Sequence, residues 1–226
     1  MLENANTEGH RFQLFTASSS VHTLIMLSES QKYQLQLLRD IIEISDLCST
    51  KTYIWGGLAI DIVEGRFLRE HRDIDGFTLN LMDVKNRMET LFQDRGYTTS
   101  FLTDFDMLRV ETNGCHAVFN RLEVENGIAM WRHIGNEGTV YFPCKWLEKK
   151  PYYFYDIPVL VSGAEFEYSI KAKVQLLSPV WQSREKDILA LEYWTKKLDD
   201  RNTNSEHLLQ QVWSDNPYWR KKGYLV

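Results

Sequence analysis

Apolar side chains recur at helical spacing in the segment that follows Ser28. Aromatic and aliphatic residues between positions 33 and 44 fall on one face of a helix, and Ser28 or Ser30 can cap its first turn. The pattern predicts a helix of about five turns. Residues 1–27 are weakly patterned, and we expect a loose arm or a small pair of strands there.

Strands and helices alternate over the next stretch. A short apolar run ends at a double glycine, and both helical segments that follow are closed by a glycine. The predicted elements are a strand at 52–55, a helix at 58–64 stopped by Gly65, a strand at 73–79 and a helix at 84–94 closed by Gly96.

Residues 106–125 have the pattern of a β-hairpin. Asn113-Gly114 is a strong signal for a two-residue turn, and alternating apolar and polar residues lie on both sides of it. Antiparallel pairing around this turn fixes which side chains share a face. The predicted pairs are Thr112 with Cys115, Glu111 with His116, and Arg109 with Val118.

Aromatic side chains gather in residues 146–155, and helical patterns follow them. They predict helices at about 165–177 and 183–198 and a short helix near 205–213, before a basic aromatic tail at 218–222.

The predicted elements indicate three parts: an N-terminal arm (1–27), a core (28–145) and a mostly helical C-terminal part (146–226). We expect an α/β (α+β) fold with a mixed sheet backed by helices.

The charge balance narrows the range of partners. The chain has 226 residues, 43% of them hydrophobic, and a formal net charge of −5. Proteins that bind nucleic acid usually carry a basic surplus, so this balance argues against nucleic acid as the main partner. No apolar run approaches the roughly 18 residues that a membrane span needs, and the N-terminus lacks a secretion-signal pattern. We therefore expect a cytoplasmic globular protein.

Two carboxylates lie two positions apart in the predicted strand 73–79. On a strand, Asp73 and Asp75 point to the same face and can share one site. Paired carboxylates in a half-apolar strand favour a neutralising cation, and hard oxygen ligands suit magnesium. A solvated strand face is the alternative interpretation.

The double glycine upstream sharpens this interpretation. Gly56 and Gly57 come where a strand ends and a helix begins, so free backbone N–H groups can face an anion. A tight turn that only lets strand and helix pack closely is the alternative. Phosphate beside metal-binding carboxylates is the arrangement that nucleotide chemistry needs.

The stretch from Trp55 to Asp75 contains, in order, the double glycine, the helix residue Asp61, the run Arg69-Glu70-His71 and the Asp-X-Asp pair. It resembles the antibiotic nucleotidyltransferases of the DNA polymerase β-like superfamily, above all the lincosamide and aminoglycoside 2″-adenylyltransferases. The resemblance continues more faintly through the hairpin and the helices after residue 165, and spans about residues 50–196.

The resemblance implies a magnesium-dependent transfer of AMP from ATP to a hydroxyl of a small molecule, with release of pyrophosphate. Gly56 and Gly57 would hold the triphosphate, and Asp73 and Asp75 would bind two magnesium ions. Basic side chains would neutralise the leaving group. Arg69 and Lys173 are the residues chosen for that role, and Arg66 and Lys171 are further candidates by position. His71 is expected to orient the loop rather than to bind metal.

The family's third carboxylate is missing from the expected position. The resemblance puts Val118 there, and valine can neither bind a metal nor accept a proton. Glu111 is the nearest carboxylate on the correct face of the predicted hairpin, so we assign it the catalytic role. A surface charge is the alternative for Glu111, and His116 is a second candidate base.

The acceptor is open at this stage. An aminoglycoside would need an acidic cleft and a lincosamide a more apolar one, either of which would make the protein an antibiotic-resistance enzyme. The rival hypotheses are a degenerate module that binds nucleotide without turnover, suggested by Val118, and a transferase that modifies protein or tRNA, as toxins of toxin-antitoxin pairs do.

Overall fold

A long strand, β5 (Cys115–Glu125), lies inside a mixed sheet. The computed structural model describes residues 27–112, 114–133, 138–173 and 182–215. Within them the strand order is β10-β7-β6-β5-β2-β1-β9-β8, and β4 and β3 extend from the first half of β5. Strands β5 and β2 run parallel, as do β1 and β9, so the expected mixed sheet is confirmed.

The helices and strands are, in chain order, α2 (Glu29–Leu47), β1 (Thr52–Trp55), α3 (Gly57–Glu64), β2 (Asp73–Leu79), α4 (Leu81–Asp94), β3 (Thr98–Leu102), η1 (Thr103–Phe105), β4 (Met107–Thr112), β5, β6 (Ile128–His133), β7 (Gly138–Pro143), η2 (Cys144–Trp146), β8 (Tyr152–Phe154), β9 (Ile157–Val161), α5 (Ala164–Ala172), α6 (Glu185–Asp199), α7 (Ser205–Gln210) and β10 (Trp213–Ser214).

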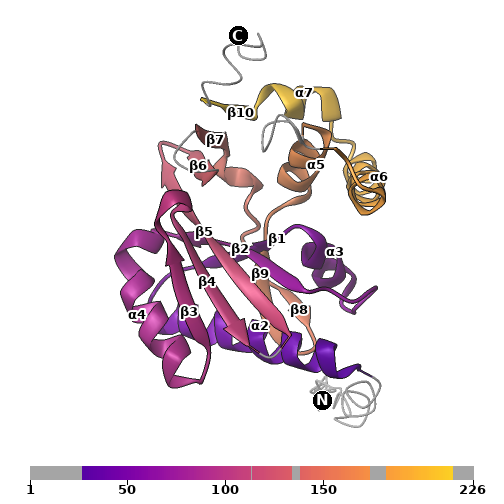
Figure 1. The fold of residues 1–226 in the computed structure, drawn as a ribbon. Helices are drawn as coiled ribbons and strands as arrows, with labels where there is room; N and C mark the ends of the chain where they lie inside the picture. The colour runs from indigo at the N-terminus through magenta and orange to yellow at the C-terminus, as the bar shows by residue number, and fades with distance from the viewer. Residues whose placement is uncertain (1–26, 113, 134–137, 174–181, 216–226) are drawn as a thin grey trace, which may run out of the picture.

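Helix α2 begins at a capping box, which confirms the predicted cap. Ser28 Oγ accepts the N–H of Gln31, and Gln31 Oε1 accepts the N–H of Ser28. The apolar face of the helix is fully buried at Leu37, Ile41 and Ile44. It packs with α4 on one side of the sheet, whereas α5, α6 and α7 gather at the other end of the molecule (Figure 1).

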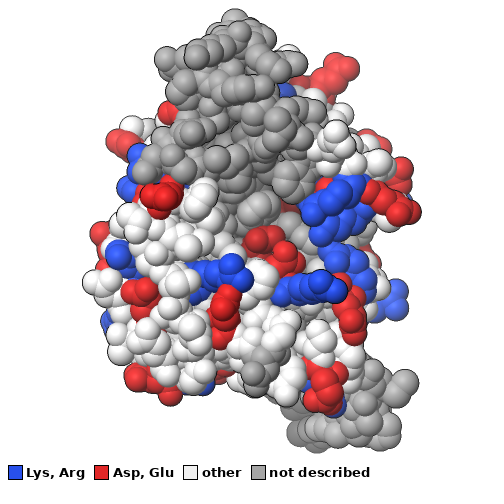
Figure 2. All heavy atoms as spheres, viewed as in Figure 1, with Lys and Arg blue, Asp and Glu red and all other residues white. Residues whose placement is uncertain are grey.

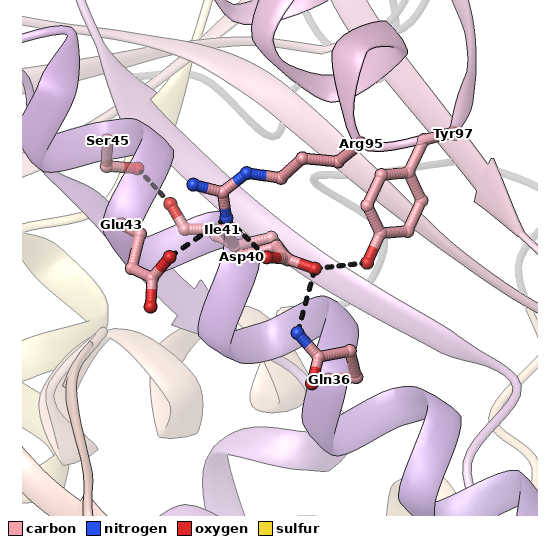
Figure 3. A network of polar contacts seen from close by, with 7 residues as sticks. All are labelled: Gln36, Asp40, Ile41, Glu43, Ser45, Arg95 and Tyr97. Atoms are coloured by element: carbon pink, nitrogen blue, oxygen red, sulfur yellow. Dashed lines mark hydrogen bonds and ion pairs between the residues drawn. The ribbon is translucent and has the colours of Figure 1, made fainter.

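A buried carboxylate links α2 to the end of α4 and the start of β3. Asp40 accepts hydrogen bonds from Gln36, Arg95 and Tyr97, and Arg95 also reaches Glu43 (Figure 3). Because Asp40 is only 7% exposed, these donors replace the water that its carboxylate loses. Burial and the bond to Asp40 raise the pKa of the Tyr97 hydroxyl, which therefore stays a donor.

The strands that carry the predicted site have the expected bounds. Strands β1 and β2 match the predictions residue for residue, and the hairpin pairs Thr112 with Cys115, Glu111 with His116 and Arg109 with Val118. Local patterns are sufficient here because alternation and turn chemistry together set the register.

The sheet continues beyond residue 145, where a mostly helical part was expected to begin. Strand β9 pairs in parallel with β1, and β10 pairs with β7. Ile157, Val159 and Val161 alternate into the core, a strand pattern that the neighbouring aromatic run and Pro158 obscure.

The C-terminal helices are anchored to α3. The Tyr193 hydroxyl donates to Glu64 at 2.6 Å, and Lys197 lies 3.1 Å from the same carboxylate. Phe166 of α5 packs against Phe77 and Trp131 on the sheet. The predicted helices near 165 and 183 are present as α5 and α6. Residues 174–181 between them, the N-terminal arm through residue 26 and the tail at 218–222 lie outside the described residues.

None of the described helices combines the length and the apolar character that crossing a membrane requires.

Candidate active site

Asp73 and Asp75 lie on one face of β2. Asp73 is paired with His116 and Asp75 with Val118 on the parallel strand β5, and Asp75 is also opposite Trp55 on β1. The alternate residues of β2, including Ile74 and Gly76, point to the other face, towards α2 and α4. Asp73 is exposed and Asp75 half-buried, so their carboxylates form the edge of an accessible surface.

Asp75 is held in surroundings that disfavour its charge. Burial is the main cause that raises its pKa to about 7, and the charges of Asp73 and Glu167 add to this effect. The ammonium groups of Lys171 and Lys186 act in the opposite direction. A bound cation would relieve the repulsion between the two aspartates.

The donor set suits magnesium. Among the described residues no group of three or more His, Cys, Asp or Glu side chains is arranged to hold a metal ion, so an ion at this site would have the aspartate pair as its protein ligands. Magnesium is commonly held by one or two carboxylates and completes its shell with water and substrate phosphates. The residues present therefore fit this ion in the company of a nucleotide.

The double glycine forms the junction between β1 and α3. Gly56 has φ +77° and ψ −142°, a conformation that residues with a β-carbon rarely adopt, and a β-carbon there would lie 3.3 Å from Asp75 Oδ2. Gly57 is the first residue of α3, and its N-cap supplies no side-chain acceptor. The start of α3 therefore offers backbone donors beside the aspartates.

Asp61 holds the loop that follows α3. Its Oδ2 accepts the N–H of Leu68 at 2.9 Å and lies 2.9 Å from His71 Nε2, and both Asp61 and His71 are buried. His71 thus orients the loop, as expected. The loop brings the guanidinium of Arg69 against Gly57, where a β-carbon would clash with it. Arg69 is the predicted phosphate-binding residue that the structure brings to the glycine turn.

Lys173 is directed elsewhere. Its ammonium group donates to the carbonyls of Leu209 and Val212, and it supports the end of α7 instead of facing the aspartates. Lys171, two residues earlier, lies 3.5 Å from Asp187 and contributes to the electrostatics of Asp75. Of the two lysines, Lys171 is the one whose charge acts on Asp75.

Glu111 lies in the same row as Asp73. The row crosses three strands, from Asp73 on β2 through His116 on β5 to Glu111 on β4. The backbones of Asp73 and Glu111 are therefore two strand spacings apart, about 10 Å measured across the sheet. Its carboxylate forms an ion pair with Arg109. The structure brings His116, not Glu111, into the strand beside the aspartates.

Val118 is directly opposite Asp75, which is the position expected for the missing carboxylate. Glu123 is on the other face of β5, where it forms an ion pair with Arg121. The strands therefore supply no substitute acid next to Asp75.

Two groups from the C-terminal helices complete the surroundings, and the sequence did not point to them. Glu167 of α5 is fully buried and binds the glycine turn. Arg184, at the start of α6, is hydrogen-bonded to Asp187, which raises its pKa, and the charge of Asp73 adds to that effect. On the face shown in Figure 2, acidic side chains near the centre are flanked by Lys and Arg on both sides. The sequence held no signal that distinguishes Glu167 from Glu165, the other glutamate in the first turn of α5.

Nucleotidyl transfer needs a site for phosphate beside metal-binding carboxylates. The start of α3, with its free backbone donors, and the aspartate pair on the next strand fit that need, and the class of protein is accordingly a nucleotidyltransferase. The sequence model of the aminoglycoside-2''-adenylyltransferase family matches residues 37–165, more than half of the chain, and the chain belongs to that family. Among curated protein sequences, none matches significantly.

Solved structures share the fold. The solution structure of the antibiotic-resistance factor ANT(2'')-Ia has a TM-score of 0.61 at 17% identity, and covers 85% of this chain and 94% of its own. Its crystal structure with adenylyl-2''-tobramycin gives 0.60 at 18% identity, over 79% and 95%. Lincomycin-bound LnuA, a lincosamide antibiotic adenylyltransferase, gives 0.52 at 15% identity, over 75% and 97%.

Proposed function

We propose that this protein transfers AMP from ATP to a hydroxyl of an antibiotic of the aminoglycoside or lincosamide type and releases pyrophosphate. The observation that carries the proposal is the position of Asp73 and Asp75 beside the glycine turn, with Arg69 over the start of α3. Family membership supports the adenylyl group and the antibiotic class.

In this proposal Asp73 and Asp75 hold magnesium. The ion would neutralise the triphosphate and lower the pKa of the attacking hydroxyl. The N-terminus of α3 and the Arg69 guanidinium bind the phosphates. Lys171 of α5 adds positive charge that acts on Asp75.

The hydroxyl proton needs an acceptor on the same face of the sheet. Glu111 remains our proposed base because, among the strands, it is the nearest carboxylate on that face beyond the aspartate pair. His116, which lies between Glu111 and Asp73, is the second candidate base. Replacing Glu111 by Gln tests this role: a base predicts a loss of kcat with an unchanged nucleotide KM.

Label transfer from [α-³²P]ATP tests the reaction and names the acceptor. The protein is incubated with magnesium and, one at a time, a panel of aminoglycosides and lincosamides, with Asp75→Asn as the matched control. Label that moves to one antibiotic with the wild-type protein alone supports the proposal. No transfer to any member, while ATP still binds, counts against it.

One observation favours a second function. Asp75 faces Val118, and no third acid or histidine joins the aspartates to form a metal-binding group in the described part of the chain. A module that binds nucleotide without turnover would have this set of side chains, with two aspartates and no third acid. Tight binding of ATP without label transfer to any small molecule, protein or tRNA would favour that module.

A further inference from the structure

A buried carboxylate from the C-terminal part is hydrogen-bonded to the glycine turn of the core. Glu167 of α5 has no exposed surface, and its Oε1 accepts the backbone N–H of Gly56 at 2.7 Å and the hydroxyl of Ser162 at 2.6 Å. The contact joins residues 111 positions apart in the sequence. It connects the turn to α5, at the place where β1 and the parallel strand β9 both end.

This carboxylate is not explained by stability. Its second oxygen, Oε2, is buried and has no hydrogen-bond partner. A half-satisfied buried carboxylate is less favourable than an apolar side chain of similar volume, and burial raises the pKa of Glu167 against the opposing effects of Lys171 and its two donors. Such a group is retained more readily where it holds a geometry that function needs.

The geometry that it holds is that of Gly56. This residue has positive φ, begins α3, and approaches Asp75 Oδ2 so closely that a β-carbon would lie 3.3 Å away. A rotation of the turn would therefore move both the donors at the start of α3 and the carboxylate of Asp75. Glu167 itself is fully covered and is not part of a metal-binding group among the described residues.

We propose that Glu167 is a positioning residue for nucleotidyl transfer, which fixes the Gly56 turn so that the start of α3 and Asp75 meet the nucleotide together. The inference rests on the proposed function. It assigns to the C-terminal part a task in the reaction that needs no contact with the substrate.

Two substitutions separate this role from packing. Glu167→Gln keeps an oxygen that can accept both hydrogen bonds and removes the charge. Glu167→Leu keeps much of the volume and removes the acceptor, leaving the Gly56 N–H unpaired. Ser169→Ala is the control, because Ser169 is a fully buried polar residue of the same helix whose hydroxyl has no hydrogen bond.

The experiment measures kcat, the dissociation constant of magnesium-ATP, the KM of the acceptor and the hydrogen exchange of the Gly56 amide in the full-length, ligand-free protein. We expect Glu167→Leu to lower kcat about 10- to 100-fold, to weaken ATP binding and to speed the Gly56 exchange, with the acceptor KM unchanged. Glu167→Gln and Ser169→Ala should stay within about threefold of the wild type on every readout.

Three results would overturn the inference. The first is a Glu167→Leu protein with normal kcat or normal Gly56 exchange. The second is a loss in Glu167→Leu that Ser169→Ala shares. The third is failure of both Glu167→Leu and Glu167→Ala to fold while Glu167→Gln folds, which would make the residue structural. A wild-type protein that transfers no label contradicts the proposed function instead. In that case the role of Glu167 is tested by two readouts alone, the hydrogen exchange of the Gly56 amide and the dissociation constant of magnesium-ATP in the Glu167 variants.

Discussion

Val118 lies opposite Asp75 on the parallel strands β5 and β2, on the face that carries both aspartates. Side chains paired in this way have β-carbons about 5 Å apart, close enough to act on one ion. A carboxylate at position 118 would therefore join the aspartate pair.

Replacing Val118 by Asp should strengthen magnesium binding. A third carboxylate adds a hard oxygen ligand and more negative charge, so the concentration of magnesium that gives half-maximal thermal stabilisation should fall at least about threefold. Thermal denaturation over a magnesium titration measures it, with Val118→Asn as the uncharged control. An unchanged midpoint, or an equal change in the Asn variant, would show that position 118 does not reach the ion.

Asp75 should make stability depend on pH when no metal is present. Its pKa is about 7 in the folded protein against an ordinary value of 3.8, so between these values the folded state binds more protons than the unfolded state. Its contribution to the free energy of unfolding therefore falls as pH rises through this window. Asp75→Asn lacks this loss, and its Tm advantage over the wild type in EDTA should be larger at pH 8 than at pH 5. A Tm difference between Asp75→Asn and the wild type that stays constant, or becomes smaller as pH rises, would contradict the raised pKa of Asp75.

Lys171 in the last turn of α5 and Lys173 at its C-cap should have different roles. Lys171→Met should raise the nucleotide KM at least about tenfold with little change in Tm, because the charge of its ammonium group acts on Asp75. Lys173→Met should lower Tm and leave the nucleotide KM within about threefold, since Lys173 donates to the carbonyls of Leu209 and Val212. Steady-state kinetics and thermal denaturation of both variants test this prediction. A raised nucleotide KM in Lys173→Met, with a lowered Tm in Lys171→Met, would contradict it and support Lys173 as the phosphate-binding residue.

The Asp40 network should contribute to stability and not to activity. Asp40→Ala leaves the partly buried Arg95 and Tyr97 without their acceptor and should lower the free energy of unfolding by about 2 kcal/mol. Glu43→Ala, which removes the more exposed partner of Arg95, should cost less than about 1 kcal/mol. Urea denaturation measures both, and equal losses would mean that burial of Asp40 adds nothing.

The parts of the fold that are set by residues close together in the sequence could be predicted from it. The bounds of β1 and β2, the cap at Ser28 and the hairpin register follow from alternation, capping and turn chemistry, all of which act over a few residues. The same patterns place Asp73 and Asp75 on one face.

The contributions of the C-terminal helices could not be predicted in this way. The contact of Glu167 with Gly56 depends on how α5 packs across the sheet, which no local pattern records. Lys171 is the last basic residue of α5 and Lys173 is its C-cap, so the packing of the end of α5 decides which of the two acts on Asp75.

Pyrophosphate release from ATP, followed against magnesium concentration with the antibiotic acceptor present, tests the central claim most directly. The wild-type protein should release pyrophosphate only with magnesium and acceptor together. Asp73→Asn and Asp75→Asn, which are nearly isosteric, should lose at least about 100-fold in kcat while remaining folded. Turnover retained in both variants would contradict the assignment of the site to this pair of aspartates.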